Sequence, residues 1–312
     1  MANDDLDRKI ILVVRRTRLQ ELVARYNTVE QAKFQAEHLG LDFSDFLQED
    51  RQYQHALKHT SAQLENHGRM QILDRGFLPN FLFPKGALVV VLGQDGLVAN
   101  TLKYLDGQPV LALNPDSKRW DGKLLPFEPA ALAKLLPEVL ANKRPTKEIV
   151  FGMATLSDGQ RMVAVNDFYV GTRSHVSSRY QITSGKVREQ HSSSGIIIST
   201  GLGSTGWLRS VLTGASVIAG GSNKKATQLR ESGFAWDSKR LVFSVREPFP
   251  SISSQASCVF GDVSPQKPLI IRSLMPEGGI IFSDGMETDG LEFRSGLEAV
   301  FNIADRSGRL LN

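Results

Sequence analysis

The segment Ala87-Leu-Val-Val-Val-Leu-Gly-Gln-Asp-Gly96 is the strongest indication of the fold of the first half of the chain. Its continuous apolar run, residues 87–92, is typical of a strand that is covered on both faces of a parallel sheet. The segment Gly93-Gln-Asp-Gly96 follows at once, and a helical pattern continues to Leu105. A glycine directly after a strand allows a sharp turn and a close approach by phosphate, and the next helix presents unpaired N–H groups. This order of strand, glycine loop and helix favours a nucleotide-binding loop.

Asp95 is the reactive candidate in this loop. A carboxylate would repel phosphate, so Asp95 is better suited to face a hydroxyl group as a general base, or to face a metal ion. The alternative is structural, with Asp95 as a helix N-cap and Gly96 as a turn residue, since short glycine motifs often occur without function.

The flanking segments continue the alternation of strand and helix. We expect strands or helices in these ranges: an apolar β-branched run at 9–14, a helix from the capping box Thr28-Val-Glu-Gln31 to Gly40, a helix at 48–67, and strands at 70–73 and 110–113. Such a βαβ rhythm predicts a doubly wound parallel sheet that binds ligands at the carboxyl ends of its strands.

The pattern changes at Phe151, where short alternating runs are separated by Gly, Ser, Asp and Pro. We expect antiparallel strands at 162–170, 178–183, 195–199, 240–245, 269–273 and 279–282. The polar segment Asn142–Lys147 is the candidate linker, and Gly220–Lys225 is expected to be a flexible loop. The predicted organisation is an α/β domain over residues 1–145, a β-rich domain over 146–295, and a C-terminal segment, 296–312, that returns to the first domain.

Composition narrows the class of protein. The 312 residues are 41% apolar and 22% charged, with one cysteine and a net charge of +4, which is ordinary for a globular protein without a disulfide framework. No apolar run reaches the length of a spanning helix, and the polar N-terminus, Met1–Lys9, does not look like a signal peptide. We therefore expect a cytoplasmic protein with no membrane and no nucleic-acid partner. His55 and His59 lack the glutamate of a zinc motif and no metal site is expected there, while basic pairs such as Arg15-Arg16 are expected on the solvated surface.

Three further motifs carry polar groups where strands should end. Asn166-Asp167 interrupts a β run, which indicates a bulge or strand end facing a ligand, or else an ordinary turn. The segment 192–207, Ser-Ser-Ser-Gly-Ile-Ile-Ile-Ser-Thr-Gly-Leu-Gly-Ser-Thr-Gly-Trp, runs from a strand into a loop suited to a ribose or phosphate, or into a merely flexible connection. Phe282-Ser-Asp-Gly-Met286 reads by itself as a hairpin turn.

Taken together, the Gly93–Gly96 loop, Asn166-Asp-Phe-Tyr-Val-Gly171, Thr200-Gly-Leu-Gly-Ser-Thr-Gly-Trp207 and the late Asp284-Gly285 resemble the motifs of the NAD kinase (ATP-NAD kinase) family in order and spacing. The Ser193–Gly195 strand entry and Phe243-Ser-Val-Arg-Glu-Pro248 are similar to the mitochondrial-type branch of that family. The resemblance covers roughly residues 86–289.

The resemblance implies a two-domain kinase that transfers a phosphoryl group from ATP or another donor to the 2′-hydroxyl of the adenosine ribose of NAD, giving NADP. Mg²⁺ would arrive with the donor, the partners would be small nucleotides, and the chain would form a homodimer or homotetramer. Asp95 matches the catalytic aspartate of the family. The implied phosphate- or nucleotide-binding residues are Gly93, Gly96 and Asn114. The implied dinucleotide-binding residues are Asn166, Asp167, Ser194, Thr200, Ser204, Thr205, Gly206, Trp207 and Asp284.

Some positions depart from the family pattern. Gln94 replaces the second glycine of the loop, Leu97 replaces the threonine that usually follows it, and Met286 replaces a glutamine. A side chain at position 94 occupies space where donor phosphates pass, and glutamine lacks the backbone freedom of glycine. These departures support an alternative, a catalytically impaired homologue that binds a dinucleotide and regulates another process.

Overall fold

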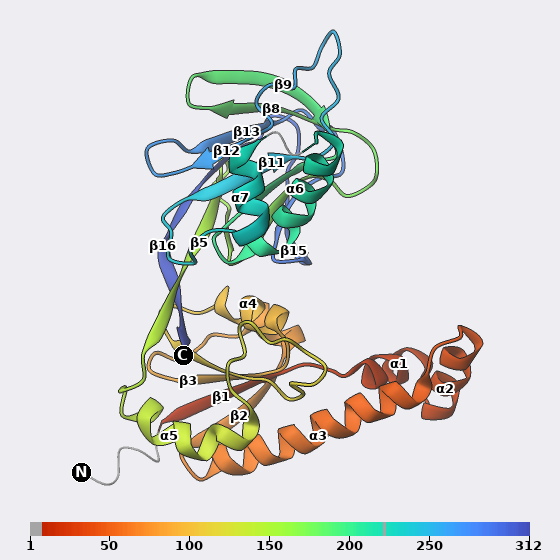
Figure 1. The fold of residues 1–312 in the computed structure, drawn as a ribbon, viewed down its shortest axis with the longest axis vertical. Helices are drawn as coiled ribbons and strands as arrows, with labels where there is room; N and C mark the ends of the chain where they lie inside the picture. Colours follow the sequence, from red (N-terminus) through yellow and green to blue (C-terminus); the bar gives the residue numbers. More distant parts are fainter. Residues whose placement is uncertain (1–7, 221–222) are drawn as a thin grey trace. The chain divides into compact units, whose positions relative to one another are not determined.

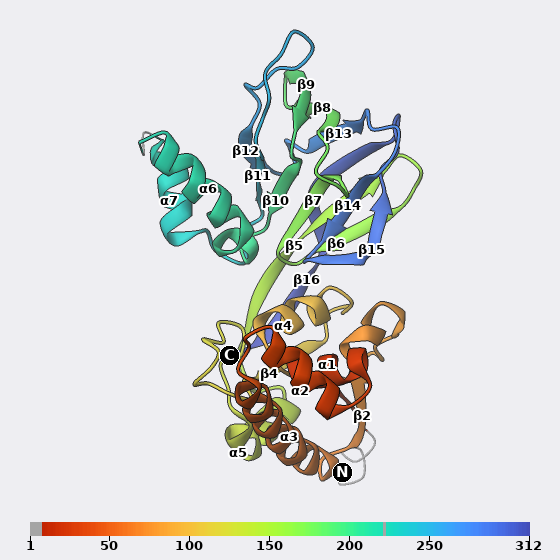
Figure 2. The same cartoon turned by 90° about the vertical axis from the view of Figure 1, so that its right-hand side faces the viewer.

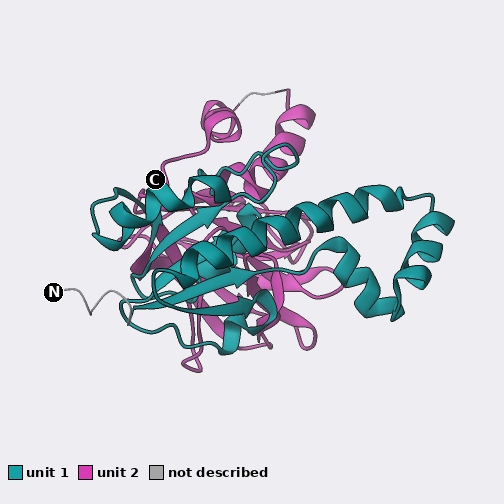
Figure 3. Cartoon of the chain, turned by 90° about the horizontal axis from the view of Figure 1, so that it is seen from below, with its two compact units in different colours: residues 1–147, 309–312 teal, residues 148–308 magenta. Residues whose placement is uncertain are grey.

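The computed structural model describes residues 8–220 and 223–312 and forms two compact units (Figure 3). Unit 1 holds Met1–Lys147 and Arg309–Asn312, and unit 2 holds Glu148–Gly308. Two strands run from one unit into the other, β5 (Thr146–Leu156) and β16 (Glu298–Leu311). The predictions for the first seven residues, and for residues 221–222 of the expected loop, lie outside the described residues.

Unit 1 is built on a parallel sheet with the strand order β2-β1-β3-β4. Its strands are β1 (Lys9–Val14), β2 (Arg69–Asp74), β3 (Leu88–Leu92) and β4 (Pro109–Leu113). All five residues of β3 are buried, as the continuous apolar run predicts. The end of β16 adds a further parallel strand beside β4, where Arg309 pairs with Pro109. The prediction of a parallel α/β sheet is confirmed.

Helices cover both faces of this sheet. The long helix α3 (Phe43–Glu65) and the shorter α5 (Leu132–Leu140) lie on one face, and α4 (Asp95–Leu102) lies on the other (Figure 1). Tyr53 of α3 and Leu135 of α5 share a buried cluster with Leu12 and Val90 of the sheet. Helices on both faces define a doubly wound sheet. Right-handed crossovers that move in opposite directions along a sheet lie on its opposite faces, as those from β1 to β2 and from β3 to β4 do.

The remaining helical segments of unit 1 connect these elements. They are α1 (Arg18–Tyr26), α2 (Val29–His38), and the short 3₁₀ turns η2 (Arg75–Asn80) and η3 (Pro129–Ala131). The prediction of a helix after Thr28 is confirmed, but the complete reciprocal capping box belongs to Thr17 and Gln20 at the start of α1. Helix α3 begins five residues before the predicted start because the Asp42 side chain caps it, accepting a hydrogen bond from the Ser44 N–H at 2.9 Å.

Ion pairs connect α3 to the segment after β1, to the start of α1, and to the loop after β4. Arg15 bonds Glu49 at 2.9 Å, and Arg18 bonds the same carboxylate and also Asp45, at 2.6 Å. Asp45 is also paired with Arg119 at 2.5 Å, and the Arg119 and Arg18 guanidinium groups hold its pKa well below the usual range. Burial alone would raise the pKa of Glu49, but its hydrogen bonds from Arg18 and Arg15 outweigh this and lower it. The prediction that Arg15 is a solvated surface residue is wrong, because its side chain is 13% exposed.

Unit 2 contains two antiparallel layers around one core. The first is a six-stranded sheet with the order β12-β11-β10-β7-β14-β15. The second contains β16, β13, β8 and β9 in that order, with β5 pairing with β16 and β6. The strands not yet given are β6 (Arg161–Ala164), β7 (Asp167–Thr172), β8 (Ser178–Ser184), β9 (Val187–Ser193), β10 (Ile196–Ser199), β11 (Leu241–Val245), β12 (Phe260–Val263), β13 (Leu269–Ser273), β14 (Gly279–Ser283) and β15 (Met286–Glu292). Phe168 and Phe301 meet edge to face in the core, with ring centroids 5.3 Å apart. The prediction of an antiparallel β domain is confirmed.

Unit 2 also carries two helices that the sequence reading did not predict, α6 (Trp207–Ile218) and α7 (Lys224–Ser232). They lie beside β10, β11 and β12 (Figure 2). Leu208 and Leu212 of α6 pack with Leu229 of α7 and Val242 of β11. The apolar residues 207, 208, 211 and 212 have the spacing of one helical face, so a periodicity search would have found α6.

Candidate functional site

Asp95 lies in the first turn of α4, immediately beyond the carboxyl end of β3. Its carboxylate accepts hydrogen bonds from two backbone N–H groups of the loop after β4, those of Leu124 at 2.8 Å and Lys123 at 3.3 Å. The N-cap of α4 is Gln94, so the structural alternative for Asp95 as an N-cap is wrong. The contacts fix the position of the carboxylate, because two main-chain donors on one loop hold both of its oxygens.

The glycines around Asp95 have different spatial requirements. A Cβ at Gly93 would lie 2.7 Å from the side chain of Leu97, whereas a Cβ at Gly96 would meet nothing within 4 Å. The backbone of Gln94 is extended, with φ −123° and ψ 165°, a conformation that any residue adopts. The departure at position 94 therefore causes no backbone strain, and only the volume of its side chain distinguishes it from glycine.

Asn114, at the end of β4, is buried and engaged within its own loop. Its amide donates to the Trp120 carbonyl at 3.0 Å, and its Oδ1 accepts from the Asp116 N–H at 3.0 Å. The left-handed Gly122 packs against the same side chain, since a Cβ there would lie 2.6 Å from Nδ2 of Asn114. Asn114 thus shapes the loop that holds Asp95.

In unit 2, the other candidate residues gather where three neighbouring strands end. Ser199, the last residue of β10, pairs with Asp167, the first of β7, and Ser283 at the end of β14 pairs with Phe168. The strand expected at 162–170 is interrupted after Ala164, and β7 starts afresh at Asp167. Asn166-Asp167 therefore lies at a strand boundary, and that its polar groups face a ligand stays a prediction.

Asp284 explains this interruption. Its carboxylate accepts hydrogen bonds from three successive backbone N–H groups, those of Val165 at 3.0 Å, Asn166 at 2.6 Å and Asp167 at 3.4 Å. Asp284 and Gly285 both have positive φ, 56° and 68°, and form a two-residue turn between β14 and β15. The hairpin prediction is confirmed, and the side chain at its corner also organises the neighbouring strand end.

The loop after β10 is held by its own hydroxyl groups. Thr200 Oγ1 donates to the Val165 carbonyl at 2.6 Å, and its N–H donates to the Asn166 carbonyl at 2.9 Å. Ser204 Oγ donates to the Gly201 carbonyl at 2.6 Å and accepts from the Phe234 N–H. Two of the predicted ligand-binding hydroxyls are therefore used to build the loop.

Two glycines allow this loop its close backbone approaches. A Cβ at Gly203 would lie 2.0 Å from the Asn166 carbonyl oxygen, and one at Gly201 would lie 2.1 Å from that of Ala235. These separations are far below a van der Waals contact, so any side chain at either position would push the loop away from Asn166 or Ala235.

Fewer of the predicted site residues have side chains without a hydrogen bond to the protein. Within residues 8–220 and 223–312, the side chains of Asn166, Asp167 and Thr205 have no hydrogen bond to the protein. Thr205 and Gly206 are exposed, and Asn166 is partly exposed. Of these three residues, Asn166 and Thr205 are at least partly exposed, whereas Asp167 is buried.

Asp167 is the most perturbed carboxyl group of the cluster. Burial, followed by the nearby charge of Asp284, raises the pKa of Asp167 to about 7. The folded state therefore holds a proton between about pH 4 and pH 7 that the unfolded chain has already released. The contribution of Asp167 to the free energy of unfolding is therefore greatest at low pH. It declines as the pH rises to about 7, by up to about 1.4 kcal/mol for each pH unit.

We expect Asp167→Asn to remove this pH dependence, because an amide needs no proton to remain neutral. In urea unfolding at pH 5 to 8, the variant should gain stability relative to the wild type as the pH rises. Asp121→Asn, at an exposed position, is the control and should follow the wild type. A wild type whose stability does not fall relative to Asp167→Asn between pH 5 and pH 7 would contradict the expectation.

Trp207 belongs to an aromatic cluster that the sequence reading missed. Its ring stacks on Tyr169 with centroids 5.8 Å apart, and Tyr169 also contacts Phe282. The Arg246 guanidinium lies 5.4 Å from the Trp207 ring and 6.0 Å from the Tyr169 ring. Arg246 lies in the Phe243–Pro248 segment, which resembles one branch of the family. That resemblance was the only sequence signal that could have pointed to Arg246.

Ser194 lies at the other end of β10 from Thr200, since it precedes the strand and Thr200 follows it. Its carbonyl accepts a hydrogen bond at 3.5 Å from the hydroxyl of Tyr169, the ring on which Trp207 stacks. Its Oγ donates to the Glu247 carboxylate. Metal-binding groups are also missing: among the described residues, no cluster of three or more His, Cys, Asp or Glu side chains could hold an ion.

Comparison with known proteins identifies the fold. No family model matches the sequence, and no curated protein matches it. The crystal structure of an NAD kinase from Archaeoglobus fulgidus in complex with ATP superposes with a TM-score of 0.56 at 14% identity, covering 97% of this chain and 93% of that one. Yeast NADH kinase complexed with NADH gives a TM-score of 0.57 at 13% identity, covering 99% and 84%. The chain therefore has an NAD kinase-like fold, a parallel α/β sheet followed by antiparallel β structure.

Among the residues that the structure describes, no helix is both long and apolar enough to cross a membrane.

Proposed function

We propose that the protein is an NAD kinase, which transfers a phosphoryl group from ATP or another donor to the 2′-hydroxyl of the adenosine ribose of NAD and releases NADP. The fold similarity to an NAD kinase bound to ATP and to an NADH kinase bound to NADH supports nucleotides as its ligands. In this proposal Mg²⁺ is part of the substrate, because it enters bound to the donor phosphates.

The observation that carries the proposal is the anchored carboxylate of Asp95 at the carboxyl end of a central parallel strand. Two backbone N–H groups hold its oxygens in place, so the group is already oriented before substrate binds. Asp95 would accept the proton of the 2′-hydroxyl as the ribose oxygen attacks the terminal phosphorus of the donor, and the bond to the donor diphosphate breaks. Gly93 and Gly96 would leave room for phosphate, and the N–H groups at the start of α4 would stabilise its charge.

The dinucleotide would be held by unit 2. Asn166, Asp167 and Thr205 would offer hydrogen-bonding side chains, and Trp207 would offer a partly exposed ring beside Arg246. Thr200, Ser204 and Asp284 would act indirectly, since their contacts position the strand ends and the loop. We further propose a cytoplasmic homodimer or homotetramer that uses neither nucleic acid nor membrane.

The direct test incubates the purified protein with NAD or NADH, Mg²⁺ and one donor at a time, ATP, GTP or polyphosphate, and detects phosphorylated product by mass spectrometry. Formation of NADP or NADPH supports the proposal. If no donor yields product while calorimetry shows tight dinucleotide binding, the impaired regulatory homologue is the correct alternative.

Gln94→Gly distinguishes an active kinase from a catalytically impaired homologue, because Gln94 is one of the departures that suggest impairment. The Gln94 backbone is extended and, among the described residues, its side chain caps no helix N–H, so we expect a stability change below about 1 kcal/mol in urea unfolding. For an active kinase we expect NADP formation to change by less than tenfold. A silent wild type that gains turnover in this variant would instead show that the Gln94 side chain obstructs the donor.

A further inference from the structure

The aromatic cluster of unit 2 leaves one face of the Trp207 ring free of its two nearest partners. The Trp207 and Tyr169 rings are nearly parallel, with 10° between their planes and 5.8 Å between their centroids. The Arg246 guanidinium lies 5.4 Å from the Trp207 centroid and 6.0 Å from the Tyr169 centroid. A group centred over the far face of Trp207, the face turned away from Tyr169, would be much further from Tyr169 than this. Neither Tyr169 nor Arg246 therefore covers the far face, and the Trp207 ring is partly exposed.

Arg246 is held in place beside these rings by its backbone. Its N–H donates to the Gly195 carbonyl at 2.8 Å, and its carbonyl accepts from the Ser194 N–H at 3.0 Å, which continues the pairing of β10 with β11. Among the described residues, its guanidinium has neither an ion pair nor a hydrogen bond. The carboxylate of Glu247, the next residue, accepts a hydrogen bond from Ser194 Oγ. Arg246 is thus a positive charge without a paired carboxylate, fixed next to Trp207.

The charge of Arg246 acts on the ring cluster. Burial raises the pKa of the Tyr169 hydroxyl, and the Arg246 charge opposes that rise. Glu287 on β15 adds to the rise, but its effect on Tyr169 is smaller than that of Arg246. Of the charges that act on Tyr169, the positive one therefore dominates.

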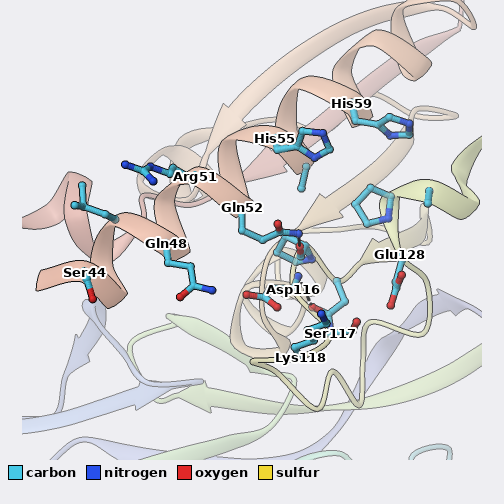
Figure 4. Close-up of a pocket in the computed structure, with 16 residues that line it drawn as sticks. Ser44, Gln48, Arg51, Gln52, His55, His59, Asp116, Ser117, Lys118 and Glu128 are labelled. Carbon is cyan, nitrogen blue, oxygen red and sulfur yellow. Dashed lines mark hydrogen bonds between the residues drawn. The ribbon is translucent and has the colours of Figure 1, made fainter. Parts of the chain in front are cut away.

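A pocket of unit 1 offers no comparable ring surface. It lies between α3 and the loop after β4 and has a volume of about 910 Å³ (Figure 4). The described residues that line it include no Phe, Tyr or Trp. Since the planar rings of nucleotides stack well on aromatic side chains, Trp207 is a better surface for such a ring than this pocket.

The two rings of a nicotinamide dinucleotide differ in charge. The nicotinamide ring carries a positive charge in NAD⁺ and is neutral in NADH, whereas adenine is neutral in both. A ring stacked on the far face of Trp207 would lie roughly 10 Å from the Arg246 guanidinium. At low ionic strength, two like charges at this distance in a partly exposed site change an affinity roughly 3- to 20-fold. Arg246 would therefore disfavour the oxidised ring and leave the reduced ring unaffected.

We propose that Trp207 and Arg246 make the protein selective for the reduced dinucleotide, NADH. The neutral dihydronicotinamide ring stacks on the far face of Trp207, and the charge of Arg246 excludes the oxidised ring. This inference rests on the proposed function, in which Asp95 of unit 1 takes the adenosine ribose and the nicotinamide end is left for unit 2. Arg246 acts through its charge and not on the reacting atoms, so it is a specificity-determining residue.

The experiment measures the affinities of the full-length protein for NAD⁺ and NADH by calorimetry at low ionic strength, without a phosphoryl donor. We expect NADH to bind at least about threefold more tightly, and high salt should reduce this preference. Arg246→Met should bring the two affinities within about twofold by tightening the binding of NAD⁺, whereas Arg246→Lys retains the charge and should retain the preference. Arg209→Met, which removes an exposed charge from α6, is the matched control and should keep the wild-type ratio. Equal affinities in the wild type, or a preference that survives Arg246→Met, overturns the proposal.

A second titration identifies the ring that Trp207 holds. Trp207→Leu should weaken the binding of NADH at least about tenfold, because a stacking surface is lost. The affinity for AMP, which has only the adenine ring, should stay within about twofold of the wild-type value. Equal weakening of AMP would place adenine on Trp207 and overturn the proposal, and thermal melts confirm that each variant is folded.

Failure of this inference differs from failure of the kinase function. A preference for NADH that depends on Arg246, in a protein that forms no phosphorylated product, supports the selectivity and refutes the kinase. Product formation with equal use of NAD⁺ and NADH supports the kinase and refutes the selectivity.

Discussion

Asp95→Asn should lower the rate of NADP formation by about 10²–10⁴-fold, the range that general acid–base groups usually supply. The substitution keeps the size of the side chain and one oxygen that can accept the Leu124 N–H, but it removes the basic oxygen that would take the ribose proton. Turnover is measured by mass spectrometry of the product. NAD affinity, measured by calorimetry, should stay within about threefold of the wild-type value, because the proposed dinucleotide-binding residues of unit 2 are unchanged.

The control for this prediction lies on the loop that holds Asp95. Asp121→Asn removes an equal charge from an exposed position close in sequence to Lys123 and Leu124, so it reports any general electrostatic effect. Its rate should remain within about twofold of the wild type. Full activity in Asp95→Asn, with Asp121→Asn equally active, would show that another group accepts the proton.

Asp284→Gly should reduce the free energy of unfolding by about 2–4 kcal/mol, because three backbone N–H groups would lose a charged acceptor. Glycine accommodates the positive φ of this position, so the loss reports the carboxylate and not backbone strain. Dinucleotide affinity should fall as well, since Asn166 and Asp167 take their positions from these hydrogen bonds. Urea unfolding and calorimetry measure the two effects.

Two further variants separate the causes of that loss. Asp284→Asn tolerates positive φ and retains one acceptor oxygen, so we expect about half of the destabilisation. Glu287→Ala, at an exposed position of the neighbouring strand β15, should change stability by less than about 0.5 kcal/mol. If Asp284→Gly were as stable as Glu287→Ala, the strand end at Val165–Asp167 would not depend on Asp284.

The parallel sheet of unit 1 was predictable because its signals are local. The buried strand Leu88–Leu92 is a continuous apolar run, and the glycine loop directly after it marks where the chain turns into α4. Helix α6 was missed although its apolar spacing was present, because the glycine- and hydroxyl-rich segment before Trp207 was interpreted as a ligand-binding loop or a flexible connection. The start of strand β5 was missed because its first two residues, Thr146 and Lys147, are polar and were assigned to the linker Asn142–Lys147.

The candidate site was only partly predictable. Motif order led to Asp95, Asn166 and Asp284, and each lies at the end of a strand. The motifs did not distinguish side chains that face a ligand from those that hold the protein together. The side chains of Thr200 and Asp284 form hydrogen bonds with backbone groups remote in sequence, those of Val165 and its neighbours.

Local sequence patterns were enough to predict the alternation of strand and helix in the first unit and the change to antiparallel strands in the second. Those features depend on neighbours along the chain, through periodicity, glycine and strand ends. Three contacts became visible only in the folded chain: Leu124 holds Asp95, Asp284 interrupts a strand more than a hundred residues before it, and Glu49 pairs with Arg15 in a nearly buried position. The physical reason is that hydrogen bonds and desolvated charges depend on which groups meet in space, and burial then makes their pairing obligatory.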